Sequence, residues 1–388
     1  MEFKFSAEHD ALRSEVRDFA KVALKDYHGA SRPTSQEDWP GQMAFLKQLA
    51  ARKWVAPAWP VPYGGLGWKH INQMIFSEEL AYAGAPDAGR VFSVGMIGPT
   101  LIVHGSEAQK RLHLPRITSG EDIWCQGYSE PGAGSDLASL QTRAVRDGDD
   151  YVVNGQKIWT TGAHHADWCF LVVRTDPDLP KHKGISFLLV DMKTPGITVQ
   201  PIVNMGGFHE FNQVFFEDVR VPVANRVGEE NNGWYVAMTL LDFERSNVAS
   251  IASNQRLLDE LAGYLRDAKP GAEYRAVLRH RLAALFIATD VGRLLSYRTA
   301  WMQETGKVVN TEASVIKVFA TELAQRISNF GVNIQGPGGG LRPGSACTAM
   351  GGQLADDHLE NVSPTIYSGS SEVQRNIIAT RGLGLPRD

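Results

Sequence analysis

The sequence predicts an α+β fold of three consecutive domains: an N-terminal α-helical domain, a middle antiparallel β-barrel domain and a C-terminal four-helix bundle. Apolar residues recur with a helical period near both ends of the chain, and short β-branched and aromatic runs replace that period between them. A chain of 388 residues exceeds the usual size of one hydrophobic core. We therefore expect domains at residues 1–120, 121–230 and 231–388.

The N-terminal segment has apolar residues at three- and four-residue spacings from Ala7 to about Ile117, beginning with Val16, Phe19 and Ala20. Residues 56–67 are rich in proline and glycine and cannot continue a helix. We expect this stretch to be a long connection between two helical pieces.

The middle segment is marked by runs of residues that favour strands. These runs are Tyr151–Val153, Ile158–Trp159, Trp168–Val173, Ile185–Val190 and Val214–Phe216. The dipeptide Asn154-Gly155 lies between the first two and favours the positive φ angles of a tight hairpin turn. An antiparallel sheet or small barrel is therefore expected here, and a Rossmann unit is disfavoured.

Helical periodicity returns from Gly233 onward. One apolar stripe is formed by Ile251, Leu258, Leu261 and Leu265, and a second begins with Leu282, Leu285 and Phe286. Long helices with such stripes pack as a bundle.

Charge and hydropathy exclude several classes of function. The formal net charge is −4, and Lys and Arg are spread along the chain, so no basic surface for nucleic acid is indicated. The chain opens without a signal region, and no apolar run reaches membrane-spanning length. We expect neither export nor membrane insertion.

The cysteines and histidines form no metal-binding pattern. Cys125, Cys169 and Cys347 are scattered and lack CxxC spacing, which argues against a disulfide framework and a thiolate metal site. His164 and His165 are adjacent, so they would not share a helical face. We expect no metal, and we expect a reducing cytoplasm.

One carboxylate stands out within the helical pattern after Gly233. Glu244 lies three residues after Leu241, four before Val248 and seven before Ile251, which would place it on the inward face of one helix. Two interpretations are open. Glu244 forms an ion pair with Arg245 or another cation, or burial raises its pKa and makes it a general base.

Two glycine-rich segments are candidate ligand loops. Residues 126–137 read QGYSEPGAGSDL, and residues 336–340 read GPGGG. Such loops can bring backbone N–H groups close to a flat polar ring or a phosphate. By themselves they indicate only turns, and no GxGxxG motif in a βαβ context accompanies them.

Taken together and in order, these motifs resemble the acyl-CoA dehydrogenase family over essentially the whole chain. Tyr128–Asp136 is similar to the family's flavin and acyl-CoA signature, Gly155–Ala163 to its isoalloxazine-contacting strand and Ile366–Arg375 to its C-terminal loop. The predicted order of helical, β and helical domains also agrees with the family's fold.

The resemblance implies FAD as the cofactor and assigns its contacts residue by residue. The implied contacts are Gln126, Tyr128, Ser129, Ser135, Trp159, Thr161, Gly369, Ser370 and Glu372. The first four would line the edge of the flavin ring, with Ser135 also near the thioester, and the next two would flank the ring and its N5 side. The last three would meet the ribityl-pyrophosphate at a helix start. Trp159 would exclude water from the ring, although an ordinary core aromatic is the alternative.

The catalytic base follows from a departure within the C-terminal loop. Many family members have Glu directly after the loop tyrosine, where this chain has Ser368. The branched- and long-chain branches instead have the base in a Leu-x-x-Glu-Arg-like setting, which resembles residues 241–245. The resemblance thus assigns Glu244 as the base and implies that Asp242 and Arg245 contact the CoA moiety.

The implied reaction is α,β-desaturation of an acyl-CoA thioester. Glu244 would remove the pro-R α-proton while the β-hydrogen leaves as hydride to flavin N5, and the electrons would pass to an electron-transferring flavoprotein. A flavin ribityl hydroxyl and a backbone N–H near Ser368 would stabilise the thioester oxygen. Alternatives are altered chemistry, such as a nitroalkane oxidase or a flavin desulfinase, and a non-catalytic subunit, and the presence of Glu244 argues against each.

A second departure concerns assembly. The Arg-x-x-Phe-Gly stretch that supplies a second flavin wall in homotetrameric relatives lacks its Phe-Gly in residues 264–271, and residues 333–338 differ from the usual Gln-x-x-Gly-Gly-x-Gly. These losses resemble heteromeric dehydrogenases, so a homotetramer and a heterotetramer with a related subunit are both open. Branched, dicarboxylic and steroid side-chain thioesters are candidate substrates, with a mild preference for a bulky or steroid-type acyl group.

Overall fold

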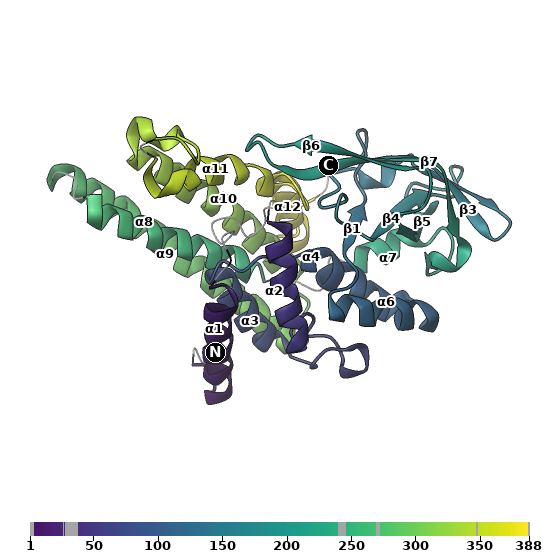
Figure 1. Ribbon diagram of the computed structural model, residues 1–388, viewed down its shortest axis with the longest axis horizontal. Coiled ribbons are helices and arrows are strands. Elements are labelled where there is room, and N and C mark those ends of the chain that lie inside the picture. Colours follow the sequence, from purple (N-terminus) through teal and green to yellow (C-terminus); the bar gives the residue numbers. More distant parts are fainter. Residues whose placement is uncertain are drawn as a thin grey trace. The chain divides into compact units, whose positions relative to one another are not determined.

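The computed structural model describes residues 4–25, 27, 38–239, 246–268, 272–346 and 348–386 (Figure 1). Helices lie at both ends of this chain, with a β-sheet between them in sequence. Two compact units can be separated, one from residues 1–33, 69–85 and 245–388, the other from residues 34–68 and 86–244. Each unit has its own hydrophobic core.

The first unit is helical. Its principal helices are α1 (Ala7–Ala23), α3 (His70–Tyr82), α8 (Val248–Ala268), α9 (Ala272–Glu304), α10 (Asn310–Ile334), α11 (Gln353–Glu360) and α12 (Ser371–Ile377). Helices α8, α9 and α10 pack against one another, and Figure 1 shows α8 and α9 side by side. Ile251, Leu258 and Leu261 are buried in this core, which confirms the apolar stripe predicted for α8.

An ion-pair network joins helices that are far apart in the sequence. The guanidinium of Arg13 on α1 pairs with Glu78 on α3 at 2.7 Å. The hydroxyl of Tyr297 on α9 donates to the two oxygens of the buried Glu78 carboxylate at 2.7 and 2.8 Å. Burial and the Glu78 charge raise the pKa of Tyr297, so its hydroxyl stays protonated and available as a donor.

The second unit combines short helices with the sheet. Its helices are α2 (Trp39–Ala51), α4 (Arg90–Phe92), a π-helical turn at Ser93–Ile97, α5 (Gly98–His104), α6 (Glu107–Ser119) and α7 (Gly233–Thr239). The proline- and glycine-rich stretch predicted as a connection does link α2 to α3 along the chain, with one 3-10 turn at Val61–Tyr63. Among the described residues, no helix is long and apolar enough to cross a membrane.

The sheet is mixed. Its strands are β1 (Trp124–Gly127), β2 (Arg143–Asp147), β3 (Asp150–Lys157), β4 (Trp168–Arg174), β5 (Ile185–Asp191), β6 (Ile197–Val203), β7 (His209–Pro222) and β8 (Arg226–Val227). The order is β6-β7-β3-β2-β4-β5-β8, and β1 pairs with β4. The pairs β1–β4 and β2–β4 are parallel, so the expected purely antiparallel arrangement is corrected. The described strand order has two ends, at β6 and β8, and forms a sheet rather than a demonstrated closed barrel.

The predicted hairpin turn at Asn154-Gly155 is wrong. Strand β3 runs through both residues, and its pairing with β7 shifts register between Val153 and Gly155, which marks a β-bulge. Gly155 is required there because its φ is 144° and an added Cβ would lie 2.7 Å from the Cα of Thr142. The turn between β2 and β3 lies at Gly148, whose φ is 63°. The positive φ of Gly155 therefore belongs to a β-bulge inside β3 and not to a turn at the end of the strand.

The network around Glu78 generates a stability prediction. Tyr297→Phe removes the hydroxyl that donates to a buried carboxylate, and we expect the free energy of unfolding to fall by about 1.5–3 kcal/mol. Tyr82→Phe is the matched control, because Tyr82 is exposed and its hydroxyl donates to Asp259 at the surface. Urea unfolding followed by tryptophan fluorescence measures both variants, and equal losses would contradict the role given to Glu78.

Candidate functional site

The predicted flavin loop is held by a tight turn directly after β1. The backbone N–H and carbonyl groups of Glu130 and Ala133 exchange two hydrogen bonds, each 3.0 Å long. Pro131 and Gly132 form the corner of this turn, where the proline ring fixes φ and stops the chain from continuing β1. Gln126 lies within β1, and its side-chain amide contacts the sulfur of Met96 at 3.6 Å.

A buried ion pair fixes this loop to the end of β3. The ammonium of Lys157, whose side chain is 0% exposed, lies 2.7 Å from the Glu130 carboxylate and donates to the carbonyl of Tyr128 at 3.0 Å. The same carboxylate accepts from the backbone N–H groups of Gln141 and Thr142 at 2.7 and 2.9 Å. Each oxygen of this buried carboxylate therefore has a nearby donor, which a buried charge requires.

The two partners shift each other's ionisation in opposite ways. Burial lowers the pKa of Lys157 to about 8, and the Glu130 charge opposes that shift. Burial raises the pKa of Glu130, but the Lys157 ammonium and the hydrogen bonds outweigh it and hold the pKa below the usual carboxylate value. The pair is ionised at neutral pH.

Sequence reasoning placed both residues inside family motifs and gave neither a role. The signal was the alternation along β3, because Tyr151, Val153 and Lys157 are all buried. A lysine among inward positions of a strand needs a counter-charge, and Glu130 supplies it.

Trp159 is presented on an unusual backbone. It lies two residues after the end of β3, has φ of 60° and is 57% exposed, with its ring edge-on to Phe211 at 5.9 Å between centroids. The backbone N–H groups of Thr160 and Gly162 donate to the carbonyls of Asn212 and Glu210 on β7, each at 2.9 Å. Trp159 is therefore not an ordinary core aromatic in this unit.

Several polar groups in the two sequence motifs that resemble the family's flavin contacts have unused hydrogen-bonding capacity. Within the described part of the chain, the hydroxyls of Ser129, Ser135 and Thr161 have no hydrogen-bond partner, and the buried hydroxyl of Tyr128 has none either. A flat ring edged with nitrogen and oxygen atoms would use such hydroxyls, and an exposed indole would cover part of its face. The residues present in this unit fit a flavin ring.

The residues predicted to meet the ribityl-pyrophosphate lie in the other unit. Gly369 has φ of 81°, and Ser370 caps α12 by accepting from the N–H of Val373 at 3.3 Å. Lys317 on α10 donates to the carbonyls of Tyr367 and Gly369 at 3.1 and 2.7 Å, which fixes the loop. A hydrogen bond with Ser370 lowers the pKa of Glu372, so this carboxylate adds a negative charge to the first turn.

The predicted base and its neighbours lie outside the described residues. This applies to Asp242, Glu244 and Arg245. Asn247, just before α8, has φ of 51°, so α8 does not extend back through it as one unbroken helix. The spacing from Glu244 to Val248 and Ile251 therefore cannot be counted along a single helix, and the assignment of Glu244 rests on the family motif.

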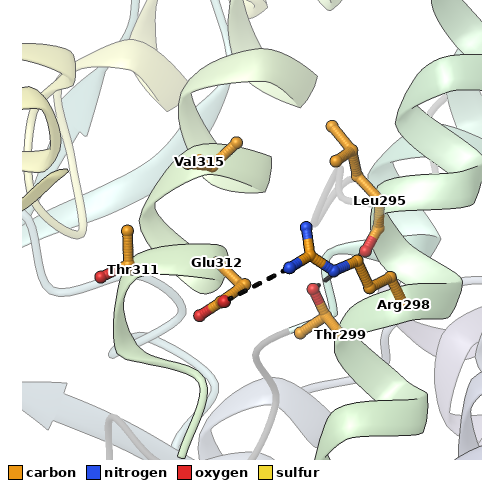
Figure 2. A pocket seen from close by; sticks show the side chains of 6 residues that line it. All are labelled: Leu295, Arg298, Thr299, Thr311, Glu312 and Val315. Carbon is orange, nitrogen blue, oxygen red and sulfur yellow. Dashed lines mark hydrogen bonds and ion pairs between the residues drawn. The ribbon is translucent and has the colours of Figure 1, made fainter. Parts of the chain in front are cut away.

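Cavities do not coincide with the predicted residues. One of about 160 Å³ lies between α9 and α10, and Figure 2 shows Arg298 facing Glu312 across it at 3.8 Å. Another, of about 240 Å³, lies beside the buried His113 in the unit that contains the sheet. Among the residues that the structure describes, no cluster of His, Cys, Asp or Glu is arranged to hold a metal ion.

Comparisons with known proteins assign the family. The N-terminal, middle and C-terminal domain models of acyl-CoA dehydrogenases match residues 6–121, 125–219 and 231–383. The chain belongs to the acyl-CoA dehydrogenase family, whose members are flavin-dependent oxidoreductases acting on CH–CH bonds.

Individual relatives match over nearly their full length. Acyl-CoA dehydrogenase IpdE1 of Mycobacterium tuberculosis is 38% identical over 368 residues, covering 95% of this chain and 93% of that protein. Among solved structures, the Tcur3481-Tcur3483 steroid ACAD has a TM-score of 0.90 at 34% identity, and each chain is covered to 100%. The ChsE4-ChsE5 complex from Mycobacterium tuberculosis has a TM-score of 0.90 at 36% identity, again with 100% of both chains covered.

The buried pair leads to a mutational prediction. Lys157→Met keeps the length of the side chain but leaves the Glu130 charge buried without its cation, and we expect a loss of about 3–5 kcal/mol in the free energy of unfolding. The double variant Lys157→Met, Glu130→Gln should recover part of that loss because no charge is left buried. Urea denaturation of the wild type, the single variant and the double variant compares them, and a double variant less stable than the single one would contradict the pair.

The same variant should also change the acid sensitivity. In the wild type the pKa of Glu130 is lowered, so its contribution to stability is lost only as pH falls through that lowered value. In Lys157→Met, burial acts without the opposing ammonium and raises this pKa. Protonation then removes the uncompensated buried charge as pH falls through the raised pKa. The stability difference between Lys157→Met and the wild type should therefore narrow at acid pH, which thermal unfolding across a pH series measures.

Proposed function

We propose that this chain binds FAD and catalyses the α,β-desaturation of an acyl-CoA thioester. The observation that carries the proposal is the exposed Trp159 on its strained backbone. It lies two residues before Thr161, and the family motifs group it with the unpartnered hydroxyls of Ser129 and Ser135. Membership of the acyl-CoA dehydrogenase family supports it. No helix-bound GxGxxG site is needed, because the segments that follow β1 and β3 would present the flavin contacts.

Individual residues of this chain would contact the flavin ring and the substrate as follows. Gln126, Tyr128 and Ser129 would bind the polar edge of the flavin ring, and Ser135 would also contact the thioester end of the substrate. Trp159 would exclude water from the ring face, and Thr161 would donate on its N5 side. FAD, when bound, would supply the acceptor for the hydride that leaves the β-carbon.

Residues nearer the C-terminus would contact the other end of the cofactor, and residues 242–245 would supply the base and the CoA contacts. Gly369, Ser370 and Glu372 would lie along the ribityl-pyrophosphate, with Lys317 holding the loop in place. Glu244 would accept the α-proton, and Asp242 and Arg245 would contact CoA. Ser368, which takes the place of the usual loop glutamate, cannot accept that proton, and this supports Glu244 as the base.

The base assignment is tested by removing one proton acceptor. Glu244→Gln should retain FAD and bind acyl-CoA, but the anaerobic bleaching of the flavin absorbance by substrate should slow by about 10²–10⁴-fold, the usual contribution of a general base. Glu229→Gln is the matched control, because Glu229 is exposed and belongs to none of the proposed contacts. Bleaching of Glu244→Gln at the wild-type rate would remove Glu244 from the mechanism.

We also propose that a related subunit completes the enzyme. The ChsE4-ChsE5 and Tcur3481-Tcur3483 assemblies among the similar structures each combine two named subunits, which supports a heteromer here. Helix α9 exposes an apolar face for such a partner, because Ile287, Val291 and Leu294 follow one another at helical spacing and are each more than a third exposed. A homotetramer is the alternative.

Substrate, electron acceptor and compartment complete the proposal. A bulky, steroid-type acyl group is favoured over a dicarboxylic one, with the Tcur3481-Tcur3483 steroid ACAD as support. Electrons would leave to an electron-transferring flavoprotein. The buried thiols of Cys125 and Cys169 face each other on β1 and β4 without a disulfide, which fits a reducing cytoplasm, and Cys347 lies outside the described residues.

Assembly is tested by FAD content. If a partner supplies the second flavin wall, the chain purified alone should hold little FAD, and co-expression with the related subunit from its gene neighbourhood should restore full occupancy and activity on a panel of acyl-CoA thioesters.

Leu294→Glu should prevent the assembly seen by light scattering, because it buries a charge at the interface. Val22→Glu, at an exposed position on α1, is the control.

Two results would contradict the proposed assembly. A fully flavinated homotetramer formed by this chain alone would overturn the heteromer. Assembly of Leu294→Glu as efficient as that of the wild type would remove α9 as the contact surface.

A further inference from the structure

We propose that Asn212 is a positioning residue that holds the segment Trp159–Gly162 in the conformation required by the flavin. This inference rests on the proposed function, because the segment acts as a flavin wall only if FAD binds there. Asn212 lies on β7, is not part of any motif discussed above and is 0% exposed.

Each polar atom of the Asn212 side chain has a partner. Its amide nitrogen donates to the carbonyl of Thr160 and to Nδ1 of His164, each at 3.0 Å. Its amide oxygen lies 2.8 Å from Nε2 of His209. Because the Thr160 carbonyl can only accept, it fixes which way the amide points. The backbone carbonyl of Asn212 also accepts from the N–H of Thr160 at 2.9 Å, so both polar groups of the Thr160 backbone are bound to this one residue.

The segment needs such a clamp because its backbone is strained. Trp159 adopts a left-handed φ of 60°, which costs a bulky residue about 1–3 kcal/mol and persists only where the surroundings impose it. The indole is 57% exposed, and its ring lies edge-on to Phe211 within the same unit. The hydrogen bonds from Thr160 and Gly162 to β7 therefore determine where Trp159 and Thr161 are presented.

Histidine tautomers follow from this arrangement. Since the Asn212 amide donates to Nδ1 of His164, that nitrogen accepts and the proton lies on Nε2. Since the Asn212 oxygen faces Nε2 of His209, that nitrogen donates. The rings lie in contact: His164 stacks on His209 at 4.0 Å and is tilted against His165 at 4.1 Å, and His165 stacks on Trp39 at 4.3 Å. These contacts hold His164 as the neutral acceptor that Asn212 requires.

The test uses the holoenzyme and an isosteric change. Asn212→Asp preserves shape but removes both donated hydrogen bonds, so the Thr160 carbonyl keeps only the longer bond from the N–H of Ala163 at 3.4 Å. We expect a shifted flavin absorbance band and a shifted flavin reduction potential. The anaerobic bleaching rate at saturating acyl-CoA should fall by about 10²-fold with little change in KM, since small misplacements near the reacting atoms have effects of this size. Asn204→Asp is the control, because the Asn204 side-chain oxygen accepts from the N–H of Phe208 at 3.0 Å, a bond that a carboxylate also accepts.

A second pair of variants separates positioning from folding. In His164→Asn, the amide oxygen can take the place of Nδ1 as acceptor, and spectrum and rate should stay near those of the wild type. In His164→Leu, the acceptor is lost, and both should move toward Asn212→Asp. Equal behaviour of the two His164 variants would contradict the proposed hydrogen bond.

Hydrogen exchange keeps the inference testable without flavin. In the full chain, Asn212→Asp should speed exchange at the amides of Thr160 and Gly162, while Asn204→Asp should not. A wild-type chain that acyl-CoA cannot bleach would count against the proposed function alone, and the exchange result would still decide the role of Asn212. Unchanged exchange, spectrum and potential in Asn212→Asp would overturn it.

Discussion

The buried ion pair between Lys157 and Glu130 is the interaction on which the candidate site depends. It joins the end of β3 to the loop after β1, and the same two side chains bind the backbone at Tyr128, Gln141 and Thr142. Removing one partner would leave a charge in a position with no water to solvate it. The loop with Ser129 and Ser135 and the segment beginning at Trp159 are therefore held together by this pair of charges and by the hydrogen bond from the N–H of Ile158 to the carbonyl of Ser129 at 2.9 Å.

A second constraint acts on the other side of Trp159. Lys157 holds the chain just before this residue, and Asn212 with the backbone of β7 holds it just after. Between these anchors, the backbone takes a left-handed turn that presents a large apolar ring to solvent. Anchors on either side of a strained, exposed aromatic residue are what a binding surface requires, since the same residue in a free loop would relax.

Much of the fold could be predicted from the sequence because apolar periodicity reports which face of a helix or strand is buried. The stripe at Ile251, Leu258 and Leu261 and the strand runs at Trp168–Val173 and Ile185–Val190 are confirmed. Asn154-Gly155 misled because a positive φ serves a β-bulge as well as a hairpin turn. The parallel pairing of β1 with β4 could not be predicted, because partner choice depends on tertiary packing that a local run does not encode.

The candidate site likewise combines features that a local sequence pattern indicates with features that only tertiary packing reveals. The loops around Ser129, Trp159 and Ser370 were found by resemblance, but the residues that hold them, Glu130, Lys157 and Asn212, become meaningful only when their buried partners are known. Glutamate, lysine and asparagine are common residues, so the sequence alone does not single these three out. Their burial does, because a buried polar side chain needs partners. The spacing argument for Glu244 does not hold, because the positive φ of Asn247 interrupts the helix along which the spacing was counted. The role of Glu244 therefore rests on the family motif.

The central claim, that the segments following β1 and β3 form a flavin wall, is tested most directly by an experimental structure of the chain with its partner subunit, FAD and an acyl-CoA. We predict that the flavin ring lies against the Trp159 indole, with the hydroxyls of Ser129 and Thr161 within hydrogen-bond distance of its edge. A flavin bound elsewhere, with these hydroxyls facing solvent, would contradict the account.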